Sequence, residues 1–310
     1  MTTTIGGETS MDFLPPGPHL PRSTTGREPQ YLLVTLLGDY WSGRREKIPS
    51  SALVDLLAEF GVTESSARQA MRRLTNRRML EQAKSGRTTF YGIPEHMSES
   101  TVARRRRVLR FGLEFTDWDE HWTVVSFSIP EKDRDVRRLL RNGLRDLKFG
   151  LLNDAIWVSP HHRVEQATAL LEELDVTDAS VMRAQILERP GREQSFIDVF
   201  DLRELEREYR DFIARHEPMV EKVIAGRVAP SEALVLRTEV MSEWLQFRQV
   251  DPTLPSQLLP EDWPRRRARE VAYHIYDELG TTAEGRFRQI IGNVDRSLAS
   301  LASHHTSRDA

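Results

Sequence analysis

The clearest chemical pattern in the chain is a row of polar and basic side chains on one face of a predicted helix, within the stretch GVTESSARQAMRRLTNRRML, residues 61–80. Arg forms paired hydrogen bonds with guanine and Gln with adenine, whereas Ser hydroxyls bind phosphate oxygens. This is the chemistry of reading a duplex through its major groove. The row consists of Ser65, Ser66, Arg68, Gln69, Arg72 and Arg73.

The opposite face of the same helix is small and apolar, because Ala67, Ala70, Met71 and Leu74 recur at three- and four-residue spacing. Thr63 precedes the helix and is a good N-cap residue. Taken alone, this pattern fits a solvated surface helix as well as a groove reader, since basic, polar faces are common on surface helices.

The element before this helix favours the groove reader. The stretch IPSSALVDLLAEFG predicts another helix, with Leu53, Leu56, Leu57 and Phe60 on one face. Gly61 then supplies the left-handed residue that ends such a helix. Two helices joined across about three residues predict a helix-turn-helix.

The element after the helix points the same way. The runs MLEQA, KSGR and TTFYGI predict two short strands around a tight turn at Ser85-Gly86. Such a hairpin is a wing, and Lys84 and Arg87 at its tip could bind phosphates.

Charge is distributed unevenly along the chain. Residues 44–110 hold 15 Lys and Arg against 7 Asp and Glu, a net of +8, although the whole chain has a net charge of −3. A basic segment in an otherwise acidic protein predicts one part that meets a polyanion. The run of four arginines at 104–107 fits phosphate contact and a solvated face equally well.

The remaining patterns predict an α+β protein with three domains. Residues 118–190 read strand, helix, two strands, helix, strand, the order of a ferredoxin-like domain, and we expect this domain to dimerise. The predicted segments are a flexible arm (1–28), a winged helix-turn-helix domain (29–97), a basic connector (98–117), the ferredoxin-like domain (118–190), a helical effector-sensing domain (196–298) and a flexible tail (299–310).

Enzymatic chemistry finds little support. The chain has no cysteine, which excludes disulfides and thiolate chemistry, and no glycine-rich phosphate loop or nucleophile elbow. We therefore predict no catalytic residues, no metal and no cofactor. A metal-dependent nuclease using Asp117, Asp119 and His121 is the alternative from another class, although these residues are better explained by capping and surface roles. The adjacent His161 and His162 lack a third metal ligand at a useful spacing.

Aromatic and basic residues near the C-terminus are candidates for binding a small molecule. A helical region interrupted by prolines is a natural place for a pocket, and arginines could hold an anionic group there. A plain hydrophobic core and a solvated helix start explain the same residues at least as well. The candidates are Trp244, Trp263, Arg265, Arg266, Arg269 and Tyr273.

Four segments resemble the PaaX-like family of transcriptional regulators, the repressors of phenylacetic acid degradation. They are LLVTLLGDYW, GVTESSARQAMRRL, the long stretch WTVVSFSIPEKDRDVRRLLRNGLRDLKFGLLNDAIWVSP, and DPTLPSQLLPEDWP. The resemblance covers about Gln30 to Gly292, and the third segment is its most specific part.

The resemblance implies a cytoplasmic, homodimeric repressor with an N-terminal winged helix, a Cas2-like ferredoxin-like middle domain and a helical C-terminal domain. It implies that an aryl-acetyl-CoA thioester such as phenylacetyl-CoA releases the DNA and allows aromatic catabolism genes to be expressed. A relative with another effector and other target genes is the alternative. The expected partners are therefore a DNA operator, a second copy and a small effector, with no membrane.

Overall fold

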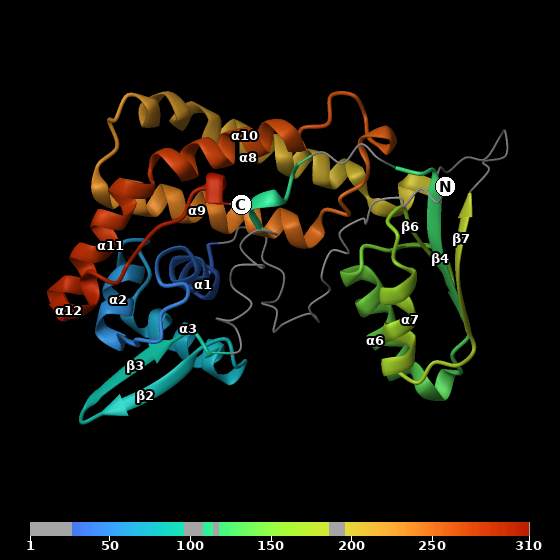
Figure 1. Ribbon diagram of the computed structural model, residues 1–310, viewed down its shortest axis with the longest axis horizontal. Coiled ribbons are helices and arrows are strands. Elements are labelled where there is room, and N and C mark those ends of the chain that lie inside the picture. Colours follow the sequence, from blue (N-terminus) through green and yellow to red (C-terminus); the bar gives the residue numbers. More distant parts are fainter. Residues whose placement is uncertain (1–26, 96–107, 114–117, 186–195, 310) are drawn as a thin grey trace, which may run out of the picture. The chain divides into compact units, whose positions relative to one another are not determined.

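The computed structural model describes residues 27–95, 108–113, 118–185 and 196–309. These residues divide into two compact units (Figure 1). The described part of the smaller unit is residues 120–185, and the remainder belongs to the larger one. The segments predicted as the winged and the helical domain fall in the same unit.

The smaller unit is a four-stranded antiparallel sheet with two helices. Its strands lie in the order β5-β6-β4-β7, and every neighbouring pair is antiparallel. This is the topology predicted for a ferredoxin-like domain. The elements are β4 (His121–Phe127), a 3-10 turn (Glu131–Asp133), α6 (Arg134–Asp146), β5 (Gly150–Asn153), β6 (Ile156–Ser159), α7 (Val164–Glu173) and β7 (Ala179–Gln185).

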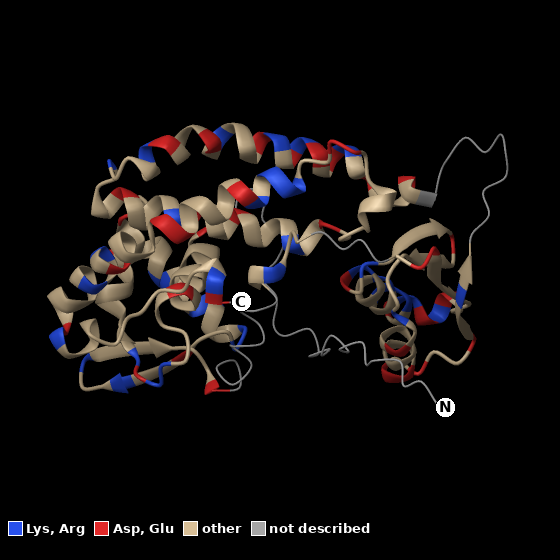
Figure 2. Cartoon of the chain, turned by 45° about the horizontal axis from the view of Figure 1, so that its top comes forward, with Lys and Arg blue, Asp and Glu red and all other residues tan. Residues whose placement is uncertain are grey.

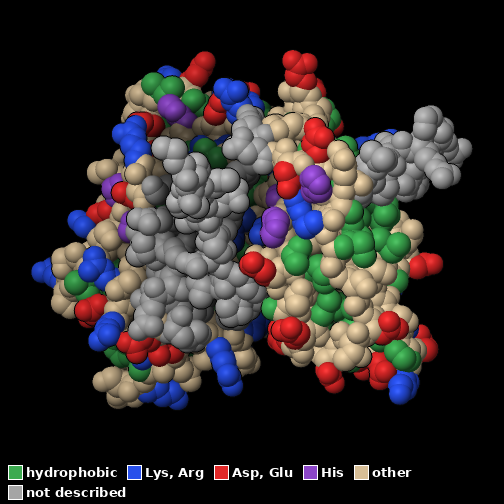
Figure 3. All heavy atoms as spheres, turned by 45° about the vertical axis from the view of Figure 1, so that its right-hand side comes forward, with side chains coloured by type: hydrophobic (Ala, Val, Ile, Leu, Met, Phe, Trp, Pro, Cys, Tyr) green, Lys and Arg blue, Asp and Glu red, His purple; other side chains and the backbone are tan. Residues whose placement is uncertain are grey.

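Alternation along β4 explains why both helices lie on one face of this sheet. Val125 and Phe127, two residues apart, point to the same face and are buried with Leu140 and Leu144 of α6. On the other face Met182 is 44% exposed, and Figure 3 shows hydrophobic side chains at the surface of this unit. The sheet is thus packed on one side, with apolar side chains also on the other.

The N-terminal part of the larger unit contains the elements predicted within and around residues 61–80. Its three strands lie in the antiparallel order β1-β3-β2. Ser85 pairs with Thr88, so the hairpin turn is Gly86-Arg87, one residue later than predicted. The elements are α1 (Pro29–Tyr40), β1 (Ile48–Pro49), α2 (Ser50–Ala58), α3 (Glu64–Asn76), β2 (Glu81–Ser85) and β3 (Thr88–Gly92).

The C-terminal part of the larger unit is helical, as the sequence predicts. Two long helices precede the proline-rich loop, and two further helices of moderate length follow it. The elements are a 3-10 turn (Phe196–Phe200), α8 (Leu202–Ile224), α9 (Pro230–Val250), a 3-10 turn (Ser256–Leu258), α10 (Arg265–Glu278), α11 (Gly280–Val294), α12 (Arg296–Ala299) and a last 3-10 turn (Ser307–Asp309). None of the helices in the described part of the chain is long and apolar enough to cross a membrane.

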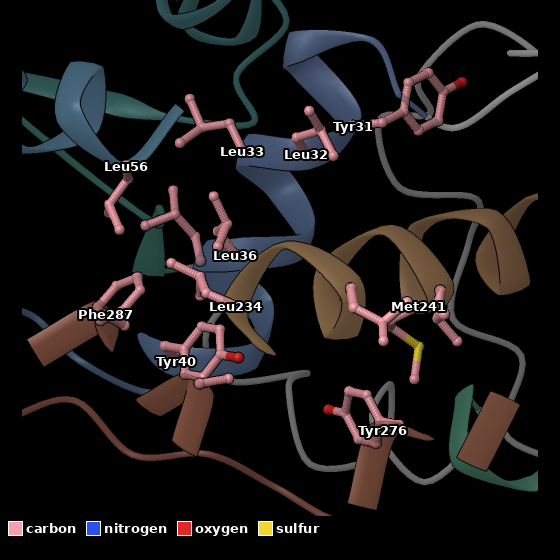
Figure 4. Packing of buried hydrophobic residues seen from close by; sticks show 14 of the residues in the cluster. Tyr31, Leu32, Leu33, Leu36, Tyr40, Leu56, Leu234, Met241, Tyr276 and Phe287 are labelled. Atoms are coloured by element: carbon pink, nitrogen blue, oxygen red, sulfur yellow. The ribbon is translucent and has the colours of Figure 1, made fainter. Parts of the chain in front are cut away.

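One continuous hydrophobic core joins the N-terminal and C-terminal parts of this unit. Leu33 and Leu36 of α1 are buried in the same cluster as Leu234 of α9 (Figure 4). The ring of Tyr40 stacks on Phe287 of α11 with the centroids 4.8 Å apart. Because α1 is apolar on nearly every side, it can face α3 and the C-terminal helices at once.

A buried arginine also connects the N-terminal and C-terminal parts of this unit. Arg237 of α9 is fully buried and donates to the carbonyl of Tyr276 at 2.9 Å and to a carboxylate oxygen of Asp39 at 3.3 Å. The guanidinium also lies 3.7 Å from the ring centroid of Tyr276, whose hydroxyl donates to Asp39. Burying a charge is costly unless it is paired and hydrogen-bonded, and here α1, α9 and α10 meet that requirement together.

The C-terminal segment is ordered and packed, which corrects the prediction of a flexible tail over 299–310. Ala302 is buried, and the amide of Ser303 donates to the carbonyl of Tyr40 at 3.2 Å. The amide of Ser307 donates to Asp277 at 2.7 Å, and the carbonyl of His305 accepts from Arg237 at 2.6 Å. Residues 299–309 therefore tie α1 to α9 and α10. The predicted arm lies outside the described residues apart from Arg27 and Glu28.

Candidate nucleic-acid interface

Helix α3 begins at the residue that the sequence predicts. The Thr63 hydroxyl oxygen accepts a hydrogen bond from the amide of Ser66 at 3.3 Å, which satisfies one of the free amides of the first turn. The same hydroxyl lies 3.1 Å from that of Ser65 and 3.0 Å from that of Ser66. Both serines therefore sit at the positive end of the helix dipole, where an anion is stabilised.

The two faces of α3 are divided as the sequence predicts. Ala67, Ala70, Met71 and Leu74 are buried, whereas all six residues of the polar row are exposed. The prediction of which side chains face outward is confirmed, because burial of the small residues fixes the rotation of the helix. That these side chains bind DNA stays a prediction.

One member of the row is held by a neighbour. Arg68 donates to Glu64 one turn earlier, with nitrogen–oxygen distances of 2.9 and 2.7 Å. Both side chains are more than half exposed, so the pair is a weak one and can exchange for a stronger acceptor. Gln69, Arg72 and Arg73 are exposed on the same face of α3.

The turn between α2 and α3 is fixed by a left-handed glycine. Gly61 has φ +73°, and its amide donates to the carbonyl of Ala58 at 2.9 Å. The next amide, of Val62, donates to Leu57 at 3.2 Å. These bonds close the end of α2, so the angle between the two helices is set by the backbone.

The β2–β3 hairpin presents the two predicted cations. Arg87 occupies the turn and Lys84 lies in β2 opposite Thr89, and both are exposed. Figure 2 shows basic residues on this hairpin. Gly86 has φ +58°, a conformation in which glycine avoids the strain of a side chain. The hairpin can therefore place positive charge beside whatever α3 contacts.

The C-terminal end of α2 is anchored to α9 and α11, a feature that the sequence pattern did not reveal. Glu59 accepts from Arg286 of α11 at 2.7 and 3.0 Å and from the hydroxyl of Ser231 of α9 at 2.5 Å. The hydrogen bond from Arg286 holds the pKa of Glu59 below its usual range. The end of α2 that precedes Gly61 is therefore fixed to α9 and α11.

The candidate effector residues are engaged in internal contacts. Trp244 is fully buried, and Arg265 is buried in an ion pair with Asp251 at 3.2 Å. Trp263 is partly buried against the same core, and Arg266 is exposed and pairs with Glu270 at 3.3 Å.

The remaining two candidates hold the described segment of the predicted connector, residues 108–113. Arg269 donates to the carbonyls of Leu109 and Phe111 at 3.0 and 3.2 Å, and the Tyr273 hydroxyl donates to Val108 at 2.9 Å. The ring of Phe111 packs 5.1 Å from that of Trp244. Trp244 thus packs against a phenylalanine of the chain itself. That the six candidates bind an effector stays a prediction.

The structure describes two of the three residues of the alternative, a nuclease, namely Asp119 and His121. No group of three or more His, Asp and Glu suited to a metal occurs among the described residues. Asp117 lies outside them, as does the arginine run at 104–107. The carbonyl of His161 accepts from Thr123 at 2.7 Å, which gives that turn a structural role.

Three family models match the chain in series. One described as PaaX-like protein matches residues 28–97, the PaaX protein central Cas2-like domain matches 116–197, and the PaaX-like protein C-terminal domain matches 200–289. The matches to the first and third fall on the two parts of the larger unit, and the match to the second falls largely on the smaller one.

Two individual proteins are similar to this chain. The transcriptional repressor PaaX of Escherichia coli K12 is 27% identical over 261 residues, which cover 81% of this chain and 80% of that protein. A solved structure of an uncharacterized protein from Mycobacterium tuberculosis is 19% identical, with a TM-score of 0.47, and covers 84% of this chain and 98% of its own.

Proposed function

The chain belongs to the PaaX-like protein family, and we propose that it is a transcriptional repressor that inserts α3 into the major groove of DNA. The observation that carries the proposal is the division of α3, whose buried small residues force the polar row outward. An α-helix fits the major groove, and Arg and Gln are the side chains that distinguish guanine and adenine there. The similarity to a named repressor supports the same conclusion.

In this proposal α1 to α3 with the β2–β3 hairpin act as a winged helix-turn-helix. Ser65 and Ser66, at the start of α3, bind backbone phosphates, whereas Arg68, Gln69, Arg72 and Arg73 contact base edges. Lys84 and Arg87 lie along the adjacent backbone. Phosphate contacts set the register, and the base contacts give sequence preference.

We propose that the protein acts as a dimer through its ferredoxin-like unit. Two copies related by a two-fold axis would present two α3 helices, so the operator would be an imperfect palindrome with half-sites about 10 bp apart or a multiple of that. The exposed apolar side chain of Met182 supports an association through the open face of the sheet.

Release of DNA is proposed to follow from linkage between the two parts of the larger unit. A ligand that binds better to a conformation with displaced C-terminal helices would lower operator affinity by that difference, typically about 1 to 3 kcal/mol. The shared core and the Glu59–Arg286 pair support this route, because they connect α11 to α2. The effector expected from the family, an aryl-acetyl-CoA thioester such as phenylacetyl-CoA, stays a prediction.

The test is selection of bound fragments from random genomic DNA, followed by footprinting of the enriched sequence. A repressor protects a defined site and leaves the DNA uncut when divalent metal is added. A panel of aryl-CoA thioesters then shows whether any of them removes the footprint. Failure to enrich any sequence would overturn the proposed function, whereas enrichment without release by a thioester would overturn only the effector.

A further inference from the structure

Helix α6 of the ferredoxin-like unit carries a second row of cations, unrelated to α3. Arg134, Arg138, Arg141 and Arg145 recur at spacings of four, three and four residues, which places them on one side of the helix. Leu140 and Leu144, each one residue before an arginine of the row, lie on an adjacent side of the helix and are buried in the core. The sequence contained this spacing, but a charged face on an amphipathic helix is ordinarily only solvated.

The arginine row lines a shallow hollow. The hollow has a volume of about 310 Å³, and Figure 2 shows the basic residues along α6. Its lining is formed by Arg134, Arg137, Arg138, Arg141, Asn142 and Arg145. The hollow is shallow and open, and all its lining residues belong to α6. Five guanidinium groups along one helix raise the local concentration of anions.

Carboxylates neutralise only part of this charge. Arg137 pairs with Glu131 at 2.9 Å, and Arg138 pairs with Asp135 at 3.2 Å. The other three arginines, Arg134, Arg141 and Arg145, form no ion pair with any residue that the structure describes. The hollow therefore holds three positive charges that have no counterion from the described chain.

Neighbouring groups hold two of these arginines in place. Arg141 donates to the carbonyl of Asp154 at 3.2 Å, while its buried Nε finds no hydrogen-bond partner among the described residues. Arg145 donates to Asn142 at 3.1 Å, and its guanidinium lies 5.4 Å from the ring centroid of Trp157. A buried donor without a partner is costly, so a ligand that accepts from it is favoured.

We propose that this hollow binds a small ligand carrying two or more linked phosphate groups. Guanidinium groups form paired, charge-assisted hydrogen bonds with phosphate oxygens, and several arginines at fixed spacing match several phosphates. A shallow hollow of this volume, lined by one helix, suits a compact ligand that several guanidinium groups reach together. The proposal goes beyond the repressor function, since it concerns the other compact unit and no operator is needed.

Calorimetric titration of the full-length protein with inorganic tripolyphosphate tests the proposal, with orthophosphate as the comparison at equal ionic strength. Tripolyphosphate is expected to bind the wild type at least about tenfold more tightly. Arg141→Ala and Arg145→Ala should each weaken its binding about tenfold, while Arg145→Lys should give an intermediate loss. Binding should also change the fluorescence of Trp157, and a Trp157→Phe variant identifies that signal.

Arg203→Ala is the matched control, because Arg203 is an exposed arginine on α8 in the other unit. Equal affinity for the two phosphates, or equal losses in Arg203→Ala and Arg141→Ala, would overturn the proposal. The affinity for a DNA duplex of random sequence is a further check. If Arg141→Ala and Arg145→Ala weaken duplex binding as much as they weaken tripolyphosphate binding, the hollow contacts DNA and the proposal is overturned. Failure here would leave operator binding by α3 intact, so the two proposals fail separately.

Discussion

At the residue scale, the exposed polar side chains of α3 differ in whether a neighbouring side chain already binds them. Arg68 shares its charge with Glu64, whereas Gln69 and Arg72 are exposed and lie one turn apart. The side chains of Gln69 and Arg72 break no interaction within the described part of the protein when they contact a base. Gln69 and Arg72 are therefore the better positions at which to test base reading.

We expect Gln69→Ala and Arg72→Ala each to cost about 1 to 3 kcal/mol of operator affinity and to relax the preference at one base position. The physical reason is loss of a paired hydrogen bond to a base edge. Binding titrations on the selected operator and on single-base variants measure both effects. Gln246→Ala, on α9, is the control, and unchanged footprints in both α3 variants would contradict the assignment.

Gly112 shows how closely the connector approaches the C-terminal helices. Its φ is +81°, and a Cβ atom there would lie 2.8 Å from the ring of Trp244 and 3.0 Å from Arg269. Gly112→Ala is expected to lower the free energy of unfolding by about 1 to 3 kcal/mol, because backbone strain and overpacking both oppose the methyl group. Chemical denaturation measures the loss. Gly226→Ala, also at positive φ but with nothing within 4 Å of its Cβ, isolates the backbone contribution.

At the element scale, the hairpin and α3 are expected to make different contributions to DNA binding. Lys84 lies on β2 beside the turn, where it can contact phosphate but is not on the helix that reads bases. Lys84→Ala should weaken binding to all sequences alike and reduce the slope of log K against log salt by about one. A salt series with operator and random duplexes tests this, and a loss confined to the operator would contradict it.

The junction between α2 and α11 gives a pH-dependent prediction. The Glu59 side chain is 15% exposed, and its hydrogen bonds from Arg286 lower its pKa. A lowered folded-state pKa contributes stability that is present above the unfolded value of about 4.3 and is lost as the pH falls through the folded value.

We therefore expect Glu59→Gln to reduce the free energy of unfolding at pH 7 by about 1 to 3 kcal/mol. The difference from the wild type should shrink as the pH falls below about 4.3 and vanish below the lowered pKa of folded Glu59, because the folded wild type then also lacks the carboxylate. Denaturation curves across that range measure it. A difference that persists unchanged at low pH would show that the charge of Glu59 is not the cause.

At the scale of the whole molecule, the proposed DNA-binding part has no separate hydrophobic core. α1 contributes to one hydrophobic cluster with α9 and α11, and the hydrogen bonds of Arg237 and Tyr276 connect α1, α9 and α10. The proposed release of DNA by a ligand on the C-terminal helices depends on this shared core.

We expect a fragment of residues 27–95 to lack a cooperative unfolding transition, because Leu33, Leu36 and Tyr40 would expose surfaces that α9 and α11 bury. Thermal melts by circular dichroism of the fragment and of the full chain test this. The larger unit of the intact protein should melt in one transition that includes α3. A fragment that melts cooperatively at the same temperature would contradict the shared core.

The sequence by itself determined the features that depend on local periodicity. The rotation of α3 follows from Ala67, Ala70, Met71 and Leu74, and the topology of the ferredoxin-like unit follows from the order of its strands and helices. Gly61 was identifiable as a helix end because glycine adopts positive φ without strain. Such signals need only residues within a few turns of one another.

Only the tertiary structure decided which separate segments meet. Asp39 and Arg237 are 198 residues apart, and Glu59 and Arg286 are 227 apart, so no local pattern links them. Two of the residues predicted to bind an effector, Trp244 and Tyr273, contact Phe111 and Val108 of the chain itself, and the predicted flexible tail packs on α1. A buried face in the sequence shows that a partner exists, but its identity follows from three-dimensional complementarity of shape and charge.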